Sequence, residues 1–322
     1  MNILTFIIAR LMPIWIVISA ALALWVPGAF RFLGSTTEWA LALILFMMGL
    51  TLERERLLKL ARKPVRPLSG SLGKWVIAPL ISIGLAVLFF GMSELSYGII
   101  MAGIVPSGTS ANLNTFIAKG DVSLSLAMSS FDTLIGPFIA PFLVKILIGS
   151  SVDFDYFSFW LKMICVVFLP LMVGISLQSI FPYLSKGIKP FIPIISSLAL
   201  YTVVLGIVSN AKSVLLQDIS ILFPIAICVF LQVTLQMVCG YGYAKLLRYS
   251  EAECRAILFE VGICNSALAA VLANDTFGSM ASVAAMANMV CNLVIGSFIA
   301  AILASTKKSA YSSITIIENK GE

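Results

Sequence analysis

The sequence contains no histidine, and only 11% of its 322 residues are charged. Without histidine, a histidine-based catalytic triad, an HExxH metal site and a histidine-ligated haem are excluded. So few charges also exclude an ordinary soluble domain, in which about a quarter of the residues are charged. The six cysteines show no CxxC pair or other ligand spacing, so we expect core thiols rather than a disulfide framework.

Apolar sequence fills the chain instead, with 60% hydrophobic residues and a mean hydropathy of +1.05. Because about 20 apolar residues cross a bilayer, we predict an all-α polytopic membrane protein with ten transmembrane helices. We recognise no removable signal segment in the first residues. The predicted spans are residues 11–29, 39–52, 72–91, 97–118, 122–148, 157–180, 191–208, 219–244, 256–272 and 281–304.

The distribution of basic residues orients these spans. Sixteen lysines and arginines fall in alternate segments that include both termini, whereas the other loops hold Arg31, Lys145 and Lys212. The positive-inside rule therefore predicts cytoplasmic N- and C-termini, with residues 305–322 as a polar cytoplasmic tail. The net charge of +6 reflects this topology, and we expect no nucleic-acid partner.

Two of the predicted spans are interrupted in the middle. Pro106 and Gly108 break the fourth span, and Gly262 marks a break in the ninth. Such breaks cost helical hydrogen bonds that lipid cannot replace, so each must lie inside protein or beside a water-filled cavity. Small polar residues follow both breaks: Thr109, Ser110 and Asn112 in the fourth span, and Asn265 and Ser266 in the ninth.

The two halves of the chain repeat this arrangement. Residues 1–155 hold five predicted helices and residues 156–304 hold five more. Because five is an odd number of crossings, the halves have opposite orientations and form inverted repeats. Matched breaks in helices 4 and 9 are typical of a transporter's midplane site. The first turn after each break offers unpaired N–H groups to an anion.

Three ionisable residues lie deep inside predicted spans, namely Lys74, Asp132 and Glu260. A charge at this depth costs at least about 2.5–3.5 kcal/mol and is a functional candidate. Glu260, beside the free carbonyls at the end of a half-helix, favours a cation site, although a simple pair with a lysine is the alternative. Lys145 and Lys162 lie nearer to helix ends and can snorkel to the interface.

Ser125 and Ser129 share one face of the fifth predicted helix. Their hydroxyls either supply oxygen to a cation held between helices 4, 5 and 9 or bond back to their own helix. Asp132 lies one turn further along. It adds charge to that site, takes part in a proton relay, or forms a structural pair with Lys74.

Three motifs together resemble the bile acid:sodium symporter family, over essentially the whole chain. They are Pro106-Ser-Gly-Thr-Ser-Ala-Asn112, Lys119-Gly-Asp121 and Glu260-Val-Gly-Ile-Cys-Asn-Ser266. The resemblance implies a panel domain of helices 1, 2, 6 and 7 and a core domain of helices 3–5 and 8–10. It further implies that helices 4 and 9 cross, that substrate binds between the domains by alternating access, and that the chain lies in a bacterial cytoplasmic (inner) membrane.

The resemblance also implies binding residues. The substrate would meet Gly108, Thr109, Ser110, Asn265 and Ser266, and the first sodium site would use Asn112, Ser125, Ser129 and Glu260. Ala111 stands where the family usually has a further serine ligand, although Ser110 is adjacent. The second-site region falls on Lys74, Val261, Ile263 and Cys264.

A second sodium ion does not suit that region, because an ammonium cannot coordinate a cation and a thiol is a poor ligand for a hard one. We therefore hypothesise that Lys74 replaces the second ion by neutralising Glu260 or Asp132. If Lys74 releases its proton during the cycle, transport would instead depend on pH.

The resemblance implies sodium-coupled symport of an organic anion, with no obligatory protein partner. The anion would be a small carboxylate such as a pantoate-like or 2-oxo acid, or a bile-acid-like molecule. The alternative is a sodium/proton exchanger or a proton-coupled anion transporter that uses Lys74, Asp132 and Glu260. A membrane enzyme with Asp132 and Glu260 as catalytic acids is a further alternative, but no G-x-S-x-G elbow, metal cluster or phosphate loop supports it, and we predict no enzymatic activity.

Overall fold

The computed structural model describes residues 12–52, 64–149, 155–215 and 219–305. Helices joined by short connections make up these residues, and the extended pairing found among them is one isolated antiparallel bridge between Ser107 and Cys264. The predicted all-helical class is confirmed. Apart from Ser305, the predicted tail lies outside the described residues, as does the basic stretch 53–63 on which the predicted orientation partly rests.

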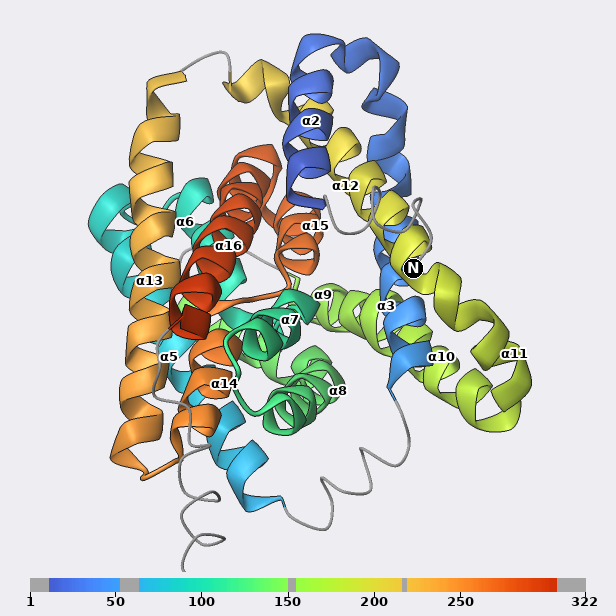
Figure 1. Ribbon diagram of the computed structural model, residues 1–322. Coiled ribbons are helices and arrows are strands. Elements are labelled where there is room, and N and C mark those ends of the chain that lie inside the picture. The colour runs from blue at the N-terminus through green and yellow to red at the C-terminus, as the bar shows by residue number, and fades with distance from the viewer. Residues whose placement is uncertain (1–11, 53–63, 150–154, 216–218, 306–322) are drawn as a thin grey trace, which may run out of the picture.

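The helices of the first half precede residue 150 (Figure 1). They are α2 (Met12–Trp25), η2 (Pro27–Ala29), η3 (Arg31–Thr36), α3 (Thr37–Thr51), α5 (Val65–Phe90), α6 (Glu94–Ile104), α7 (Thr109–Ile117) and α8 (Val122–Leu147).

The helices of the second half include one π-helix, η4. They are α9 (Tyr156–Lys162), η4 (Met163–Phe168), α10 (Leu169–Ile180), α11 (Pro182–Ile188), η5 (Lys189–Phe191), α12 (Ile192–Leu215), η6 (Ile219–Ile221), α13 (Leu222–Leu246), α14 (Glu251–Gly262), α15 (Ser266–Phe277) and α16 (Ser279–Ser305).

Seven helical segments in the described part of the chain are long and apolar enough to cross a membrane. The other three predicted spans correspond to α2 and to the pairs α6/α7 and α14/α15, whose single helices are shorter. The structure therefore supports a membrane protein with many helical crossings. The count of ten crossings and their inverted-repeat relation stay predictions.

Several predicted spans were too short at their first residues. The third predicted span begins at Val65 rather than Leu72, and the ninth begins at Glu251 rather than Ala256. At Ser250 a capping box explains the earlier start, because Ser250 and Glu253 exchange side-chain to backbone hydrogen bonds. Searching for apolar runs leaves out such polar first turns.

The helices pack in two groups. On one side, α3 packs against α10 and α12, and α12 also packs against α2. On the other side, α13 packs against α5 and α14, and α16 packs against α6 and α15. Figure 1 shows α13 and α10 at opposite sides of the molecule. The assignment of these groups to a panel and a core domain stays a prediction.

The two helix breaks lie side by side where the second group faces α2, α3 and α12 of the first. The N–H of Gly108 donates to the carbonyl oxygen of Ile263 at 3.1 Å, and the N–H of Asn265 donates to that of Pro106 at 2.8 Å. Each break thus supplies hydrogen-bond partners for backbone groups that the other break exposes.

Gly108 allows this close approach. Its φ of −85° is open to any residue, but a Cβ there would lie 2.7 Å from the carbonyl oxygen of Cys264. The requirement for glycine is therefore one of space between two backbones.

We expect Gly108→Ala to lower the stability of the purified protein by about 1–3 kcal/mol, because the added methyl forces the two breaks apart. Gly84→Ala is the matched control, since Gly84 lies within α5 and a Cβ there meets nothing within 4 Å. The measurement is the melting temperature in detergent. Equal melting temperatures for the two variants would show that the breaks do not need this contact.

Candidate functional site

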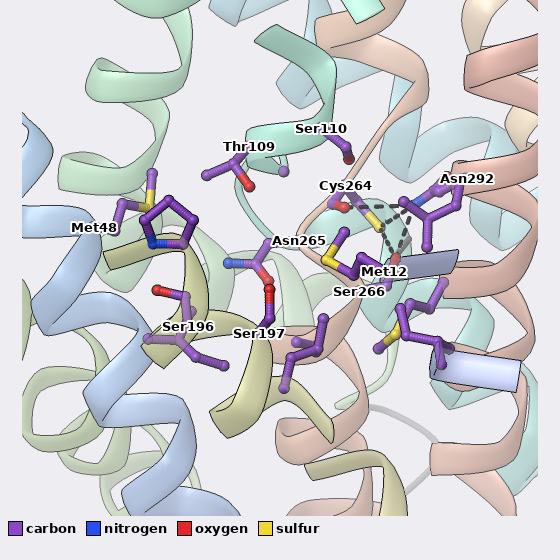
Figure 2. A pocket seen from close by; sticks show the side chains of 18 of the residues that line it. Met12, Met48, Thr109, Ser110, Ser196, Ser197, Cys264, Asn265, Ser266 and Asn292 are labelled. Atoms are coloured by element: carbon purple, nitrogen blue, oxygen red, sulfur yellow. Dashed lines mark hydrogen bonds between the residues drawn. The ribbon is translucent and has the colours of Figure 1, made fainter. Parts of the chain in front are cut away.

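A cavity of about 330 Å³ lies where the two breaks face α2, α3 and α12 (Figure 2). The breaks contribute Gly108, Thr109, Ser110, Cys264, Asn265 and Ser266, and the facing helices contribute Met12, Met48, Ser196 and Ser197 among others. None of the described residues that line it is charged. All five residues predicted to meet substrate therefore share one cavity.

Two helices begin at the wall of this cavity, α7 at Thr109 and α15 at Ser266. The first N–H groups of a helix lack intrahelical acceptors and carry partial positive charge. Asn265 caps α15 by accepting the N–H of Leu268 at its Oδ1, at 3.2 Å. Its Nδ2 is then the end of the amide that can donate to a ligand. The arrangement can hold a small anion without a cationic side chain.

The hydroxyl of Ser266, one of the residues predicted to meet substrate, belongs to a hydrogen-bond network in the cavity wall. Its hydroxyl donates to Oδ1 of Asn288 at 2.9 Å and accepts from Nδ2 of Asn292 at 2.7 Å. The predicted hydrogen bond from this hydroxyl to substrate would have to break that network. Ser266 is thus part of the cavity wall, and its N–H donates to the carbonyl oxygen of Cys264 at 3.0 Å.

The network behind Ser266 contains residues that the sequence analysis missed. Asn288 also accepts from the thiol of Cys264 at 3.1 Å and donates to Gln232 at 3.0 Å. Gln232 in turn donates to Ser82 at 2.8 Å. Asn288 and Asn292 are four residues apart in α16, so two amides at this spacing within an apolar run were the available signal.

A second cluster lies around the buried carboxylate of Glu260. The hydroxyls of Ser125 and Ser129 lie 2.5 and 2.9 Å from its Oε1, and both lie near Oδ1 of Asn112, at 2.9 and 3.2 Å. The structure therefore brings together all four residues predicted for the first sodium site. Ser110, which is adjacent to Ala111, lines the cavity.

This cluster contains more hydrogen-bond acceptors than protons. Each of the two serine hydroxyls carries one proton, yet each lies within reach of both the carboxylate and the Asn112 amide oxygen. A cation would relieve this excess, and a set of carboxylate, amide and hydroxyl oxygens suits a hard one. Ser129 also donates to the carbonyl oxygen of Ser125 at 2.9 Å, so the predicted bond back to its own helix is present.

A third buried cluster is an ion pair between Lys74 and Asp132, which contacts Val105 and Ser107 at the break in the fourth span. Nζ of Lys74 lies 3.7 Å from Oδ2 of Asp132, donates to the carbonyl oxygen of Val105 at 2.7 Å, and sits 3.9 Å from the centre of the Trp75 ring. Trp75 and Ser107 also donate to Asp132, at 2.9 and 3.1 Å. Lys74 and Asp132 are 1% and 0% exposed, so the pair is fully buried.

Little in the second-site region offers oxygen. The side chains of Lys74, Val261, Ile263 and Cys264 contain none, and the carbonyl oxygen of Ile263 already accepts the N–H of Gly108. The ammonium of Lys74 donates a hydrogen bond to the carbonyl oxygen of Val105, the residue that follows the end of α6.

Lys162 does not simply reach for the membrane interface, as its position near a helix end suggested. Its ammonium lies 2.6 Å from Glu38 and 3.1 Å from Asp275. These carboxylates come from α3 and α15, and their approach to Lys162 depends on tertiary packing.

Apolar helices that surround a cavity, with two helix breaks joined at its wall, define an integral membrane protein of the transporter class. The sequence profile described as "Sodium Bile acid symporter family" matches residues 39–218. This chain belongs to that family, and the resemblance predicted from the three motifs is confirmed.

Relatives are similar over most of their length. "Uncharacterized sodium-dependent transporter YocS" of Bacillus subtilis is 30% identical over 288 residues, which cover 89% of this chain and 88% of that protein. "Probable sodium/metabolite cotransporter BASS1, chloroplastic" of Arabidopsis thaliana is 29% identical over 298 residues, covering 90% and 72%. These names describe transporters rather than enzymes, and the family implies sodium as the coupling ion.

We expect sodium to raise the melting temperature of the detergent-purified protein more than potassium does, because a cation bound to the folded state stabilises it. At about ten times the dissociation constant the gain is about 1.4 kcal/mol. Glu260→Gln should remove the difference between the salts, whereas Glu94→Gln, at an exposed glutamate in the first turn of α6, should keep it. Identical responses to both salts in the unmodified protein would argue against a selective site.

Proposed function

We propose that this protein is a sodium-coupled symporter of a small organic anion and works by alternating access. The observation that carries the proposal is the joining of the two helix breaks. It points the first turns of α7 and α15 at one cavity and leaves the Glu260 cluster beside the same breaks. The printed names of the relatives, a sodium-dependent transporter and sodium/metabolite cotransporters, support sodium coupling.

The cavity favours a small substrate. Its volume of about 330 Å³ is at the low end of ligand pockets, which span roughly 300–1,000 Å³. A compact metabolite carboxylate, such as a pantoate-like or 2-oxo acid, fits this volume better than a bile-acid-like molecule. The carboxylate would lie against Thr109, Ser110 and the Nδ2 of Asn265, and its apolar part would face Met12 and Met48.

We propose one sodium ion per cycle, bound by Asn112, Ser125, Ser129 and Glu260. The buried charges at the breaks are Lys74, Asp132 and Glu260, whose sum is one negative charge when all are ionised. In the carrier without its anion, one sodium ion at Glu260 neutralises this sum, whereas a second would leave an uncompensated positive charge. In this arrangement the ammonium of Lys74 takes the place of a second ion.

We further propose that the chain lies in a bacterial cytoplasmic membrane with both termini inside. The first residues of α2 and α12 and the last residues of α3 line the cavity. In the predicted orientation these ends face the cytoplasm, so the structure corresponds to an inward-facing state.

A sodium/proton exchanger or proton-coupled transporter is the second candidate. The buried pair of Lys74 and Asp132 favours it, because such a pair can exchange a proton when the protein changes conformation.

Flux measurements in proteoliposomes separate these candidates. We expect a panel of labelled small monocarboxylates to include at least one that accumulates when an inward sodium gradient is imposed, and not when potassium replaces sodium. Sodium-driven proton movement without any anion flux would support the exchanger and overturn the symporter.

We expect Asn265→Asp to weaken binding of a transported monocarboxylate by about 1–3 kcal/mol or more, because the variant loses the Nδ2 donor and adds a repelling charge. The new carboxylate can still cap α15, so the helix start is preserved. Asn265→Ala removes both the cap and the donor, and its melting temperature shows how much the cap contributes. The measurement is inhibition of labelled-anion flux at varied substrate concentration. An unchanged affinity in Asn265→Asp would exclude Asn265 from the anion site.

We expect the sodium dependence of transport to have a Hill coefficient of about one in the unmodified protein, since one free ion binds. The double variant Lys74→Gln with Cys264→Gln offers side-chain oxygens in place of the ammonium and thiol, and its coefficient should rise toward two. A value near two before any substitution would refute the idea that Lys74 replaces an ion. If transport in the unmodified protein also varies strongly with pH near neutrality, Lys74 exchanges its proton during the cycle.

A further inference from the structure

The ion pairs of Lys162 join three helices that are distant in sequence. Lys162 ends α9, Glu38 lies in the first turn of α3, and Asp275 lies near the end of α15. Nζ of Lys162 is 2.6 Å from Oε1 of Glu38 and 3.1 Å from Oδ2 of Asp275. Asn274 also donates to Asp275 at 3.3 Å. Figure 1 shows α9 beside α3 and α15.

This cluster lies at the opposite end of the same helices from the cavity. The later residues of α3, such as Met48 and Thr51, line the cavity, whereas Glu38 lies at its start. On α15 the order is reversed, because Ser266 lines the cavity and Asp275 follows nine residues later, about 13 Å along the helix.

Apolar packing fills the space between the cavity and the cluster. The buried residues there come from both packing groups, including Leu41 and Leu45 of α3, Val203 and Ile207 of α12, and Val271 and Leu272 of α15. The cavity is therefore closed toward the Lys162 cluster in this structure, and the ion pairs lie on the far side of these apolar residues.

The segment that carries Lys162 has a built-in place to bend. The π-helix η4 begins directly after Lys162, and π-helical turns inside α-helices mark functional sites and kinks. Before the π-helix, α9 contacts α8, and the hydroxyl of Tyr156 donates to the carbonyl oxygen of Pro141 at 2.6 Å. After the π-helix, α10 packs against α3. Because α8 packs against α5, the two ends of this segment contact different packing groups.

The exposure of the cluster suits pairs that open and close. The side chains of Lys162, Glu38 and Asp275 are 28%, 40% and 14% exposed. Ion pairs that water can reach contribute little to stability and are replaced by hydration at small cost. The buried pair of Lys74 and Asp132 lacks this property, because separating it would leave an uncompensated charge.

We propose that Lys162 is a gating residue, whose ion pairs with Glu38 and Asp275 hold the far end of the cavity closed and open when the carrier turns to that side. The proposal rests on the alternating-access function proposed above. Movement of α15 away from α3 separates Asp275 from Glu38. Bending at η4 then sets whether Lys162 stays paired with Glu38 or with Asp275.

A cysteine added to the cavity wall, beside the native Cys264, tests the gate. Thr109→Cys places a thiol at an exposed position of the cavity wall, and a membrane-impermeant maleimide is applied separately to each side of the membrane. Labelling of the protein without Thr109→Cys gives the background from native cysteines. We expect the unmodified gate to restrict labelling largely to one side. Lys162→Gln should raise labelling from the other side about tenfold, a shift that corresponds to about 1.4 kcal/mol.

Two controls separate the gate from a loss of folding or a change in charge. Lys145→Gln removes another lysine near a helix end, whose ammonium lies 4.9 Å from the Tyr156 ring centre, and should leave labelling unchanged. Lys162→Arg keeps both ion pairs and should restore one-sided labelling. If Lys162→Gln fails to fold, Glu38→Gln removes one partner and takes its place in the comparison.

Labelling from the far side that is the same with and without Lys162→Gln would overturn the gate. So would an increase that Lys145→Gln reproduces. The labelling needs neither sodium nor an anion, so its result is independent of the flux measurement. Absence of sodium-driven anion flux would refute the symporter while leaving the labelling result intact.

Discussion

Two broken helices can meet in the interior of this protein because each satisfies the backbone of the other. Gly108 donates across the junction to Ile263, and Asn265 donates back to Pro106. Lipid offers no partner for these groups, so each break is satisfied from within the protein by the other. Glycine at position 108 permits the approach, because a side chain there would meet the carbonyl of Cys264. The cavity, the charged clusters and the proposed function all depend on this junction.

The junction connects two kinds of site at short range. On its cavity side lie the first turns of α7 and α15, which favour an anion. Beside it lie the oxygen cluster of Glu260 and the pair of Lys74 and Asp132. Ser107 links them, since its hydroxyl lies 3.0 Å from the carbonyl oxygen of Glu260 and 3.1 Å from Asp132. A cation that repositions Glu260 would therefore also shift Ser107 and the backbone that receives the anion. This shift is the physical basis for the proposed coupling.

Charge in this protein takes two forms with different physical roles. The pair of Lys74 and Asp132 is sealed from water, so it acts as a fixed element of the junction and balances charge without a diffusible ion. The cluster around Lys162 is reached by water and joins helices of both packing groups, so its pairs can exchange for hydration. Alternating access requires a junction that stays intact and helix ends that separate, and the buried and the exposed ion pairs suit these two requirements.

The sequence by itself determined the helical membrane class and the two breaks, while its resemblance to a known family implied the four residues around Glu260. The first two features are local: apolar runs set the helices, and Pro106 and Gly108 interrupt one of them. The spacing of Ser125 and Ser129, which places both on one face, is local as well. Only the tertiary structure decided which distant side chains meet. It committed the hydroxyl of Ser266 to Asn288 and Asn292, and it placed Lys162 between carboxylates from α3 and α15. Such partnerships follow from how the helices pack, and no local spacing in the chain encodes them.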